Sequence, residues 1–195
     1  MNYFEVFCLD RKLGIDAQAL QSRFYELSRR WHPDFQQGRT PEAQAEALER
    51  SALVNAAYRA LRDPIARVEY LVRLAEGRDT KGGAVVKPKA PPELLEEIFE
   101  LLETLAEARA GGLDDDRRAE LAVERDRLVK RLAAEEDRLK GSLATAWDSA
   151  TPADRPRVLA ALKDALAVRA YLRTVIDDLT NALEGQESDA AHHRH

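Results

Sequence analysis

The chain is poor in cysteine, aromatic and β-branched residues. Its single cysteine, Cys8, excludes an internal disulfide and any cysteine-rich metal or cluster site. Aromatic residues make up only 6% of the chain, so side chains of the kind that strands favour are scarce. No segment approaches the roughly 18 consecutive apolar residues of a membrane-spanning helix, and the N-terminus lacks the basic lead and apolar run of a signal peptide. We therefore expect a cytoplasmic protein with no membrane partner.

Alanine, leucine, glutamate and arginine are abundant instead. Hydrophobic residues reach 45% and charged residues 33% of the 195 positions, which is enough for a packed core in one large or two small domains. This composition is typical of an all-helical protein. The net charge is −5, and residues 93–195 carry 15 lysines and arginines against 23 acidic residues. The acidic C-terminal half argues against a nucleic-acid partner.

The apolar spacing of the first third predicts an antiparallel helical hairpin with short flanking helices. The expected helices span 16–31 and 41–62, with flanking helices near 3–7 and 64–76. Pro33 restricts the residue before it to extended geometry, so the first helix should end near Trp31. Thr40 and Pro41 then cap and begin the second helix. One apolar face of the first helix carries Leu20, Phe24, Leu27 and Trp31. Together these elements predict an N-terminal domain at 1–76.

A linker and a second helical domain follow. Residues 77–91 are rich in glycine and proline and predict a linker. Apolar residues at helical spacing then predict three long helices with short connections, which form an antiparallel three-helix bundle at 92–185. The second of these helices can continue past Gly141 to Trp147. Residues 186–195 are polar and predict a disordered tail.

The tripeptide His32-Pro33-Asp34, placed between two such helices, resembles the signature of J domains, the co-chaperone modules that act on DnaK-type ATPase chaperones. Four further stretches resemble HscB-type co-chaperones of iron–sulfur cluster assembly. They are Asn2-Tyr3-Phe4-x-x-Phe7-x-Leu9, Val54-Asn55-Ala56-Ala57-Tyr58-x-x-Leu61-x-x-Pro64-x-x-Arg67-x-x-Tyr70-Leu71, Leu94-Leu95-Glu96-Glu97-Ile98 and Ala170-Tyr171-Leu172-Arg173. The resemblance covers residues 2–184. The chain departs from it at Cys8, Asp10 and Phe35, where relatives carry Gly, Pro and often a basic residue.

The resemblance implies binding to an ATP-loaded HscA or DnaK-type chaperone and stimulation of its ATPase. The chain itself would then be a regulator and not an enzyme, with no cofactor and no metal. The chaperone-binding residues implied are His32, Pro33, Asp34, Arg23, Arg29 and Arg30. Their chemistry fits this role, because Asp34 can form a charge-assisted bond with a partner arginine and the arginines can steer toward an acidic patch.

The resemblance further implies that the C-terminal bundle carries an IscU-type scaffold protein. Five apolar residues of the first bundle helix cover more of its surface than one buried stripe needs. They are Leu94, Leu95, Ile98, Phe99 and Leu102. The resemblance points to Leu94, Leu95 and Ile98 as the scaffold-binding patch, with Glu97 as a polar contact. Phe99 is a further candidate, and Val168 and Tyr171 would border the patch.

Three rival functions are weighed. A general J-domain co-chaperone for protein folding shares the tripeptide, but it would have a Gly/Phe-rich segment and a cysteine-rich client domain, which this chain lacks. An enzyme would need a motif such as a Gly-rich phosphate loop, a nucleophile elbow or a paired-histidine motif, and the sequence has none of these. A non-enzymatic helical adaptor would not need His32-Pro33-Asp34. The general co-chaperone and the adaptor remain as alternatives.

Overall fold

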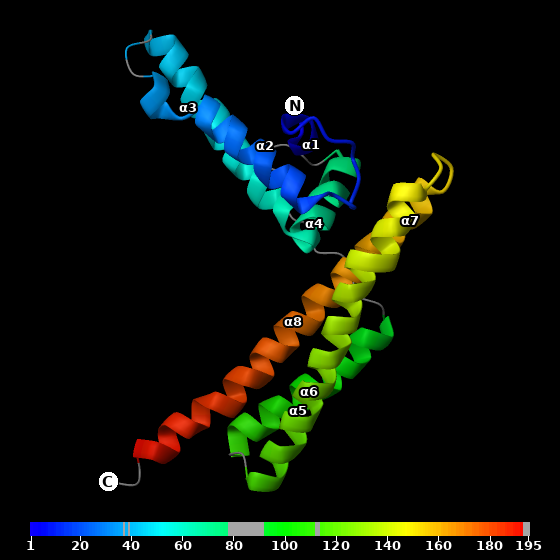
Figure 1. Cartoon of the computed structure of the whole chain (residues 1–195). Coiled ribbons are helices and arrows are strands. Elements are labelled where there is room, and N and C mark those ends of the chain that lie inside the picture. The colour runs from blue at the N-terminus through cyan, green and yellow to red at the C-terminus, as the bar shows by residue number, and fades with distance from the viewer. Residues whose placement is uncertain (37, 39, 78–91, 112–113, 193–195) are drawn as a thin grey trace. The chain divides into compact units, whose positions relative to one another are not determined.

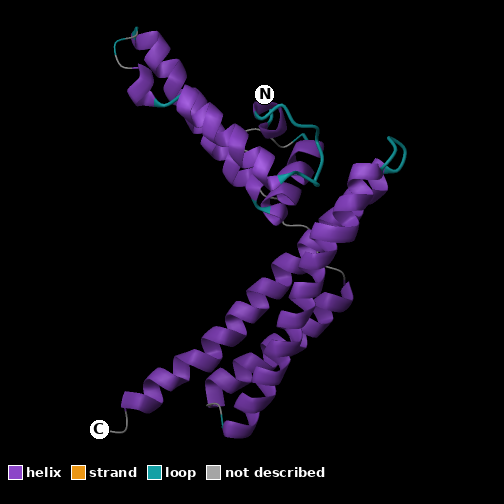
Figure 2. Ribbon diagram, viewed as in Figure 1, coloured by secondary structure: helices purple, strands orange, loops and turns teal. Residues whose placement is uncertain are grey.

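The computed structural model describes residues 1–36, 38, 40–77, 92–111 and 114–192. Every regular element in these ranges is a helix, which confirms the predicted all-α class (Figure 2). In chain order the elements are α1 (Tyr3–Val6), α2 (Ala17–Arg30), η1 (Pro33–Gln36), α3 (Pro41–Arg62), α4 (Pro64–Ala75), α5 (Pro92–Gly111), α6 (Asp115–Arg138), η2 (Leu139–Leu143), α7 (Ala144–Ser149) and α8 (Arg155–His192). None of the described helices is long and apolar enough to cross a membrane. From residue 78 onward, the predicted linker lies outside the described residues.

Side-chain caps set the helix boundaries of the hairpin. The Asp16 carboxylate accepts hydrogen bonds from the Gln18 and Ala19 amides at 2.8 and 3.0 Å, which satisfies N–H groups that a helix start leaves unpaired. Thr40 and Asp63 cap α3 and α4 in the same way, and each of these helices has a proline in its first turn. The predicted end of the first helix and the predicted start of the second are confirmed.

The described chain divides into two compact units. Their boundaries differ from the predicted domains at residues 139–162. The first unit combines Met1–Val85 with Leu139–Leu162, and the second combines Val86–Arg138 with Lys163–His195. Residues 139–162, which the sequence places in the bundle domain at 92–185, therefore pack with the helices of the predicted domain at 1–76. The reason lies in long-range contacts, which leave no mark in the local apolar spacing.

The core of the first unit lies between the α2–α3 hairpin and the two short helices α1 and α4. In Figure 1, α2 and α3 lie side by side. Phe24 and Tyr58 stack across the hairpin with ring centroids 4.0 Å apart. The Tyr3 amide donates to the Tyr70 hydroxyl at 2.8 Å, which ties α1 to α4. The largest fully buried side chains of this unit are Phe4, Phe7, Leu20, Leu61, Tyr70, Leu71, Leu139 and Leu162.

A polar clamp joins the 139–162 segment to the loop between α1 and α2. The two carboxylate oxygens of Asp148 accept hydrogen bonds from the Leu13 and Gly14 amides, both at 2.7 Å. The Trp147 indole N–H donates to the Arg11 carbonyl at 3.1 Å. Arg67, only 5% exposed, donates to the Leu13 carbonyl as well. Burial lowers the pKa of the Arg67 guanidinium, while the nearby Asp148 carboxylate acts in the opposite direction.

The second unit is a bundle of α5, α6 and part of α8. Glu97 pairs with Arg131, the Arg118 guanidinium donates to the Leu183 carbonyl, and Arg169 pairs with Glu136. The Arg118–Leu183 and Glu136–Arg169 contacts show that α6 runs antiparallel to α8. The buried core residues are Ile98, Leu105, Leu121, Leu128, Leu172, Val175, Leu179, Ala182 and Leu183.

The predicted disordered tail at 186–195 needs correction. Helix α8 continues to His192, so residues 186–192 are helical, and residues 193–195 lie outside the described part. The polarity of this stretch suggested disorder. However, it contains glutamine, glutamate and alanine, which favour helices, and no proline that would end one.

Candidate functional site

The His32-Pro33-Asp34 loop lies in the connection between α2 and α3, at the tip of the hairpin (Figure 1). The Asp34 amide donates to His32 Nδ1 at 3.2 Å, and the Asp34 Oδ2 lies 3.5 Å from the same nitrogen. The Phe35 amide donates to the His32 carbonyl at 3.1 Å. The local hydrogen bonds therefore hold the loop in a short 3-10 turn, and the Asp34 side chain stays 72% exposed.

The three arginines of α2 have different surroundings. Arg23 donates to the carbonyls of Phe7 and Cys8, at the end of α1, so it also stabilises the fold. Arg30 packs over the Trp31 ring at 5.3 Å from the centroid. Arg29 is exposed and lies on the side of the helix opposite the buried Leu20. Arg23 and Arg30 are seven residues apart and therefore share one side of α2, and Arg29 lies roughly 100° around the helix from Arg30.

The apolar surface of α5 differs from the predicted patch. Ile98 is only 6% exposed and belongs to the bundle core, so it is not a surface contact. The sequence does not distinguish buried from exposed apolar positions on α5, because this helix is apolar on more than one side. The side chain of Leu94 lies outside the described residues. Among the described side chains of α5, the large exposed apolar residues are Leu95 at 41%, Phe99 at 70% and Leu102 at 39%.

The other residues predicted for the scaffold-binding surface, Glu97, Val168 and Tyr171, make contacts within the bundle. Glu97 pairs with Arg127 and, at 2.6 Å, with Arg131 of α6. Helical geometry places Glu97 and Phe99 on opposite flanks of the buried stripe, so the two cannot belong to one small patch. Val168 and Tyr171 on α8 are half-buried and pack against the core. We define the exposed surface of Leu95, Phe99 and Leu102 as the α5 stripe.

Comparisons with known proteins identify the N-terminal domain and relate the fold to solved structures. A model of the DnaJ domain family matches residues 2–70, the segment that holds the hairpin and its loop. Residues 2–70 are a J domain. The chaperone HscB from Vibrio cholerae is 28% identical, with a TM-score of 0.54 over 92% of this chain and 99% of that one. The human co-chaperone protein HscB has the same fold, with 23% identity and a TM-score of 0.61 over 92% of this chain and 81% of that one. The J-domain match and the likeness to the Vibrio cholerae protein support an HscB-type J-domain co-chaperone.

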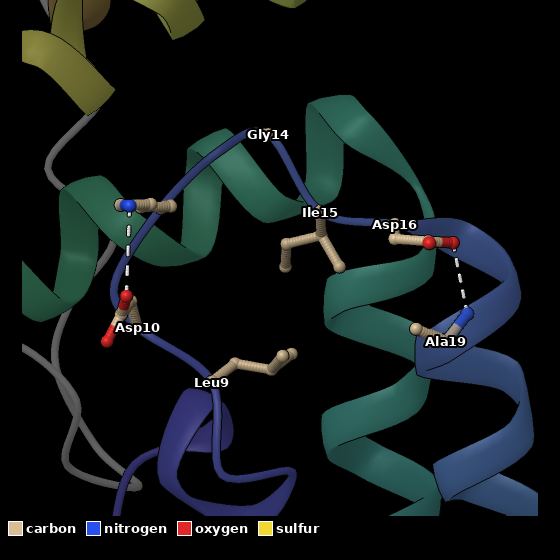
Figure 3. Close-up of a pocket in the computed structure, with 7 residues that line it drawn as sticks. Leu9, Asp10, Gly14, Ile15, Asp16 and Ala19 are labelled. Atoms are coloured by element: carbon tan, nitrogen blue, oxygen red, sulfur yellow. Dashed lines mark hydrogen bonds and ion pairs between the residues drawn. The ribbon is translucent and has the colours of Figure 1, made fainter.

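The loop between α1 and α2 of the J domain surrounds a small pocket (Figure 3). Leu9, Asp10, Gly14 and Asp16 line it, and the dashed line from Asp16 to Ala19 is the helix cap of α2. Its volume of about 180 Å³ is below the roughly 300–1,000 Å³ of ordinary ligand sites. No group of three or more His, Cys, Asp or Glu side chains in the described part of the chain could hold a metal ion.

Sequence reasoning missed two features of the J domain's loop. Phe35 is 63% exposed, and its ring meets the His32 ring edge-on at 5.9 Å between centroids. The guanidinium of Arg50, on α3, lies over the Trp31 ring at 5.4 Å from the centroid. The sequence singles out Phe35 only as a departure from relatives. It contains no signal for Arg50, because this contact joins residues on opposite arms of the hairpin.

Proposed function

We propose that this protein is a co-chaperone of iron–sulfur cluster assembly in the cytoplasm. Its J domain stimulates the ATPase of an HscA or DnaK-type chaperone, and its C-terminal bundle delivers an IscU-type scaffold protein. The chain acts as a regulator of the partner's ATPase and performs no covalent chemistry of its own. The observation that carries this proposal is the exposed His32-Pro33-Asp34 loop at the end of a J-domain hairpin.

The geometry of the loop supports the chaperone contact. The 72% exposed Asp34 carboxylate can accept a charge-assisted hydrogen bond from a partner arginine. Because the Asp34 amide donates to His32 Nδ1, the neutral His32 ring carries its proton on Nε2 and can donate outward. Exposed Arg29 adds positive charge beside the loop, which speeds association with an acidic surface in a salt-dependent way.

The α5 stripe supports the scaffold contact. Phe99 exposes 70% of its surface although it neighbours the buried Ile98. Exposed aromatic and aliphatic residues grouped on one helix face are typical of an interaction surface. A general J-domain co-chaperone for protein folding would also use an apolar surface. The two functions differ in what binds the stripe, because a dedicated scaffold is a folded partner and general clients are unfolded chains.

A pull-down from native lysate tests the proposal. Wild-type protein should recover an Hsp70-type chaperone in the presence of ATP together with an iron–sulfur scaffold. The Asp34→Ala variant should recover the scaffold alone. Recovery of many unrelated unfolded proteins, with no scaffold, would favour the general co-chaperone instead.

Replacing Phe99 with alanine should weaken scaffold binding about 30-fold, since a central aromatic anchor of an interface contributes roughly 2 kcal/mol or more. Isothermal titration calorimetry with the purified scaffold measures the change. Val123→Ala is the matched control, because Val123 is also 70% exposed but lies on α6. Equal scaffold affinity for wild type and the Phe99 variant would exclude the α5 stripe from the interface.

A further inference from the structure

Trp31 connects the α2 helix to the His32-Pro33-Asp34 loop. Its amide donates to the Leu27 carbonyl at 3.0 Å, which closes the last turn of the helix. The indole lies near two guanidinium groups, with Arg30 at 5.3 Å and Arg50 at 5.4 Å from the ring centroid. Both distances are within the range of a cation–π interaction. The residue immediately before the loop is therefore bound by cations from both arms of the hairpin.

Apolar packing restrains this indole only in part. Trp31 is half-buried, and it lines a cavity of about 410 Å³ together with Leu27, Leu53 and Arg50. Space on that side allows the ring to turn about its χ angles if nothing holds it. Arg30 is the neighbour of Trp31 on the same arm and moves with it. Arg50 is thus the cation that ties the ring to α3.

Arg50 is itself held in position. Its guanidinium lies 3.3 Å from the Glu46 carboxylate, one helical turn earlier on α3. Such a pair on a helix surface orients the side chain even where it adds little stability. The chain of contacts therefore runs from Glu46 to Arg50 on α3, then to Trp31 at the end of α2, and ends at the loop.

We propose that Arg50 is a positioning residue for the His32-Pro33-Asp34 loop and acts through Trp31. The inference rests on the proposed function, because it concerns how the loop meets the chaperone. With Arg50 present, the indole and the backbone that follows it keep one orientation. Without it, the free protein populates several loop orientations, and only a fraction of molecules can bind. The apparent affinity then falls to that fraction of its wild-type value, while the bound complex is unchanged.

The experiment measures ATP hydrolysis by the Hsp70-type chaperone of the same genome as the full-length chain is titrated. In the Arg50→Met variant, which keeps an apolar stem but lacks the cation, the concentration for half-maximal stimulation should rise about 2- to 5-fold. The maximal rate should stay unchanged. Arg50→Lys should restore the wild-type concentration, because an ammonium group can also bind the ring face.

Two further variants separate positioning from a general effect on α3. Arg62→Met is the matched control, because Arg62 lies on the same helix and over the Tyr58 ring at 5.9 Å, in a second cation–π pair. It should leave the half-maximal concentration unchanged. Glu46→Gln removes the charge that pairs with Arg50 but keeps the cation over Trp31, so a smaller rise than in Arg50→Met is expected.

Nuclear magnetic resonance of the free protein gives the deciding readout. The Trp31 indole N–H and the Asp34 amide signals should shift or broaden in Arg50→Met and stay in place in Arg62→Met. A raised half-maximal concentration with unchanged signals would overturn the inference and make Arg50 a direct chaperone contact. An unchanged concentration would overturn it as well. A wild-type chain that fails to stimulate hydrolysis would contradict the proposed function instead, and the signals of the free protein would still decide whether Arg50 orients the loop.

Discussion

Replacing Asp34 with alanine should abolish stimulation of the chaperone's ATPase and leave scaffold binding intact. The carboxylate is the exposed acid of the loop, and truncating one partner of a charge pair that becomes buried at an interface costs roughly 2–5 kcal/mol. Because the side chain is 72% exposed, its loss should not disturb the fold. Single-turnover ATP hydrolysis measures the first effect, and calorimetry with the scaffold measures the second.

The control for this variant is Glu26→Ala, which removes another exposed acid from the same J domain. It should stimulate hydrolysis like the wild type. If Asp34→Ala stimulated as well as Glu26→Ala does, the loop would not be the chaperone contact, and a helical adaptor would become the better account of this fold.

Replacing Asp148 with alanine should lower the free energy of unfolding by about 1.5–3 kcal/mol. The carboxylate accepts hydrogen bonds from the Leu13 and Gly14 amides, and its loss leaves both donors without that partner. Asp148→Asn keeps one acceptor oxygen and should give an intermediate loss. Urea denaturation measures stability, and hydrogen exchange of the Leu13 and Gly14 amides reports the clamp itself.

Asp164→Ala serves as the control, because Asp164 is an exposed aspartate of α8 outside the clamp. It should change neither stability nor amide exchange. If the Leu13 and Gly14 amides exchanged at wild-type rates in Asp148→Ala, the polar clamp would not hold residues 139–162 against the loop between α1 and α2.

Local signals explain why the hairpin could be predicted from the sequence. The caps Asp16 and Thr40, the prolines and the 3.6-residue apolar spacing act within a few residues, so they determine helix boundaries wherever the helices pack. The loop of the candidate site was recognised for the same reason, since Pro33 marks its place between two periodic segments. The π-helical segment η2 at Leu139–Leu143 was not recognised, because the spacing around it continues smoothly.

Features that depend on tertiary partners were missed. Asp148 and Arg67 take their roles from hydrogen bonds to the Leu13 segment, more than fifty residues away in each case. Ile98 and Phe99 are neighbours of similar hydrophobicity, and only the packing of α6 and α8 decides which one is buried. The sequence favours a partner contact for Glu97, because nothing in it indicates the ion pairs with Arg127 and Arg131 of α6.

In this account the J domain stimulates the chaperone's ATPase while a separate surface binds the scaffold. The most direct test is a single-turnover hydrolysis assay with chaperone, full-length chain and scaffold. The account predicts that chain and scaffold together accelerate hydrolysis more than their separate effects combined. Phe99→Ala should lose this extra acceleration but keep stimulation by the chain alone. Hydrolysis at the chaperone's own rate, with or without the scaffold, would contradict the account.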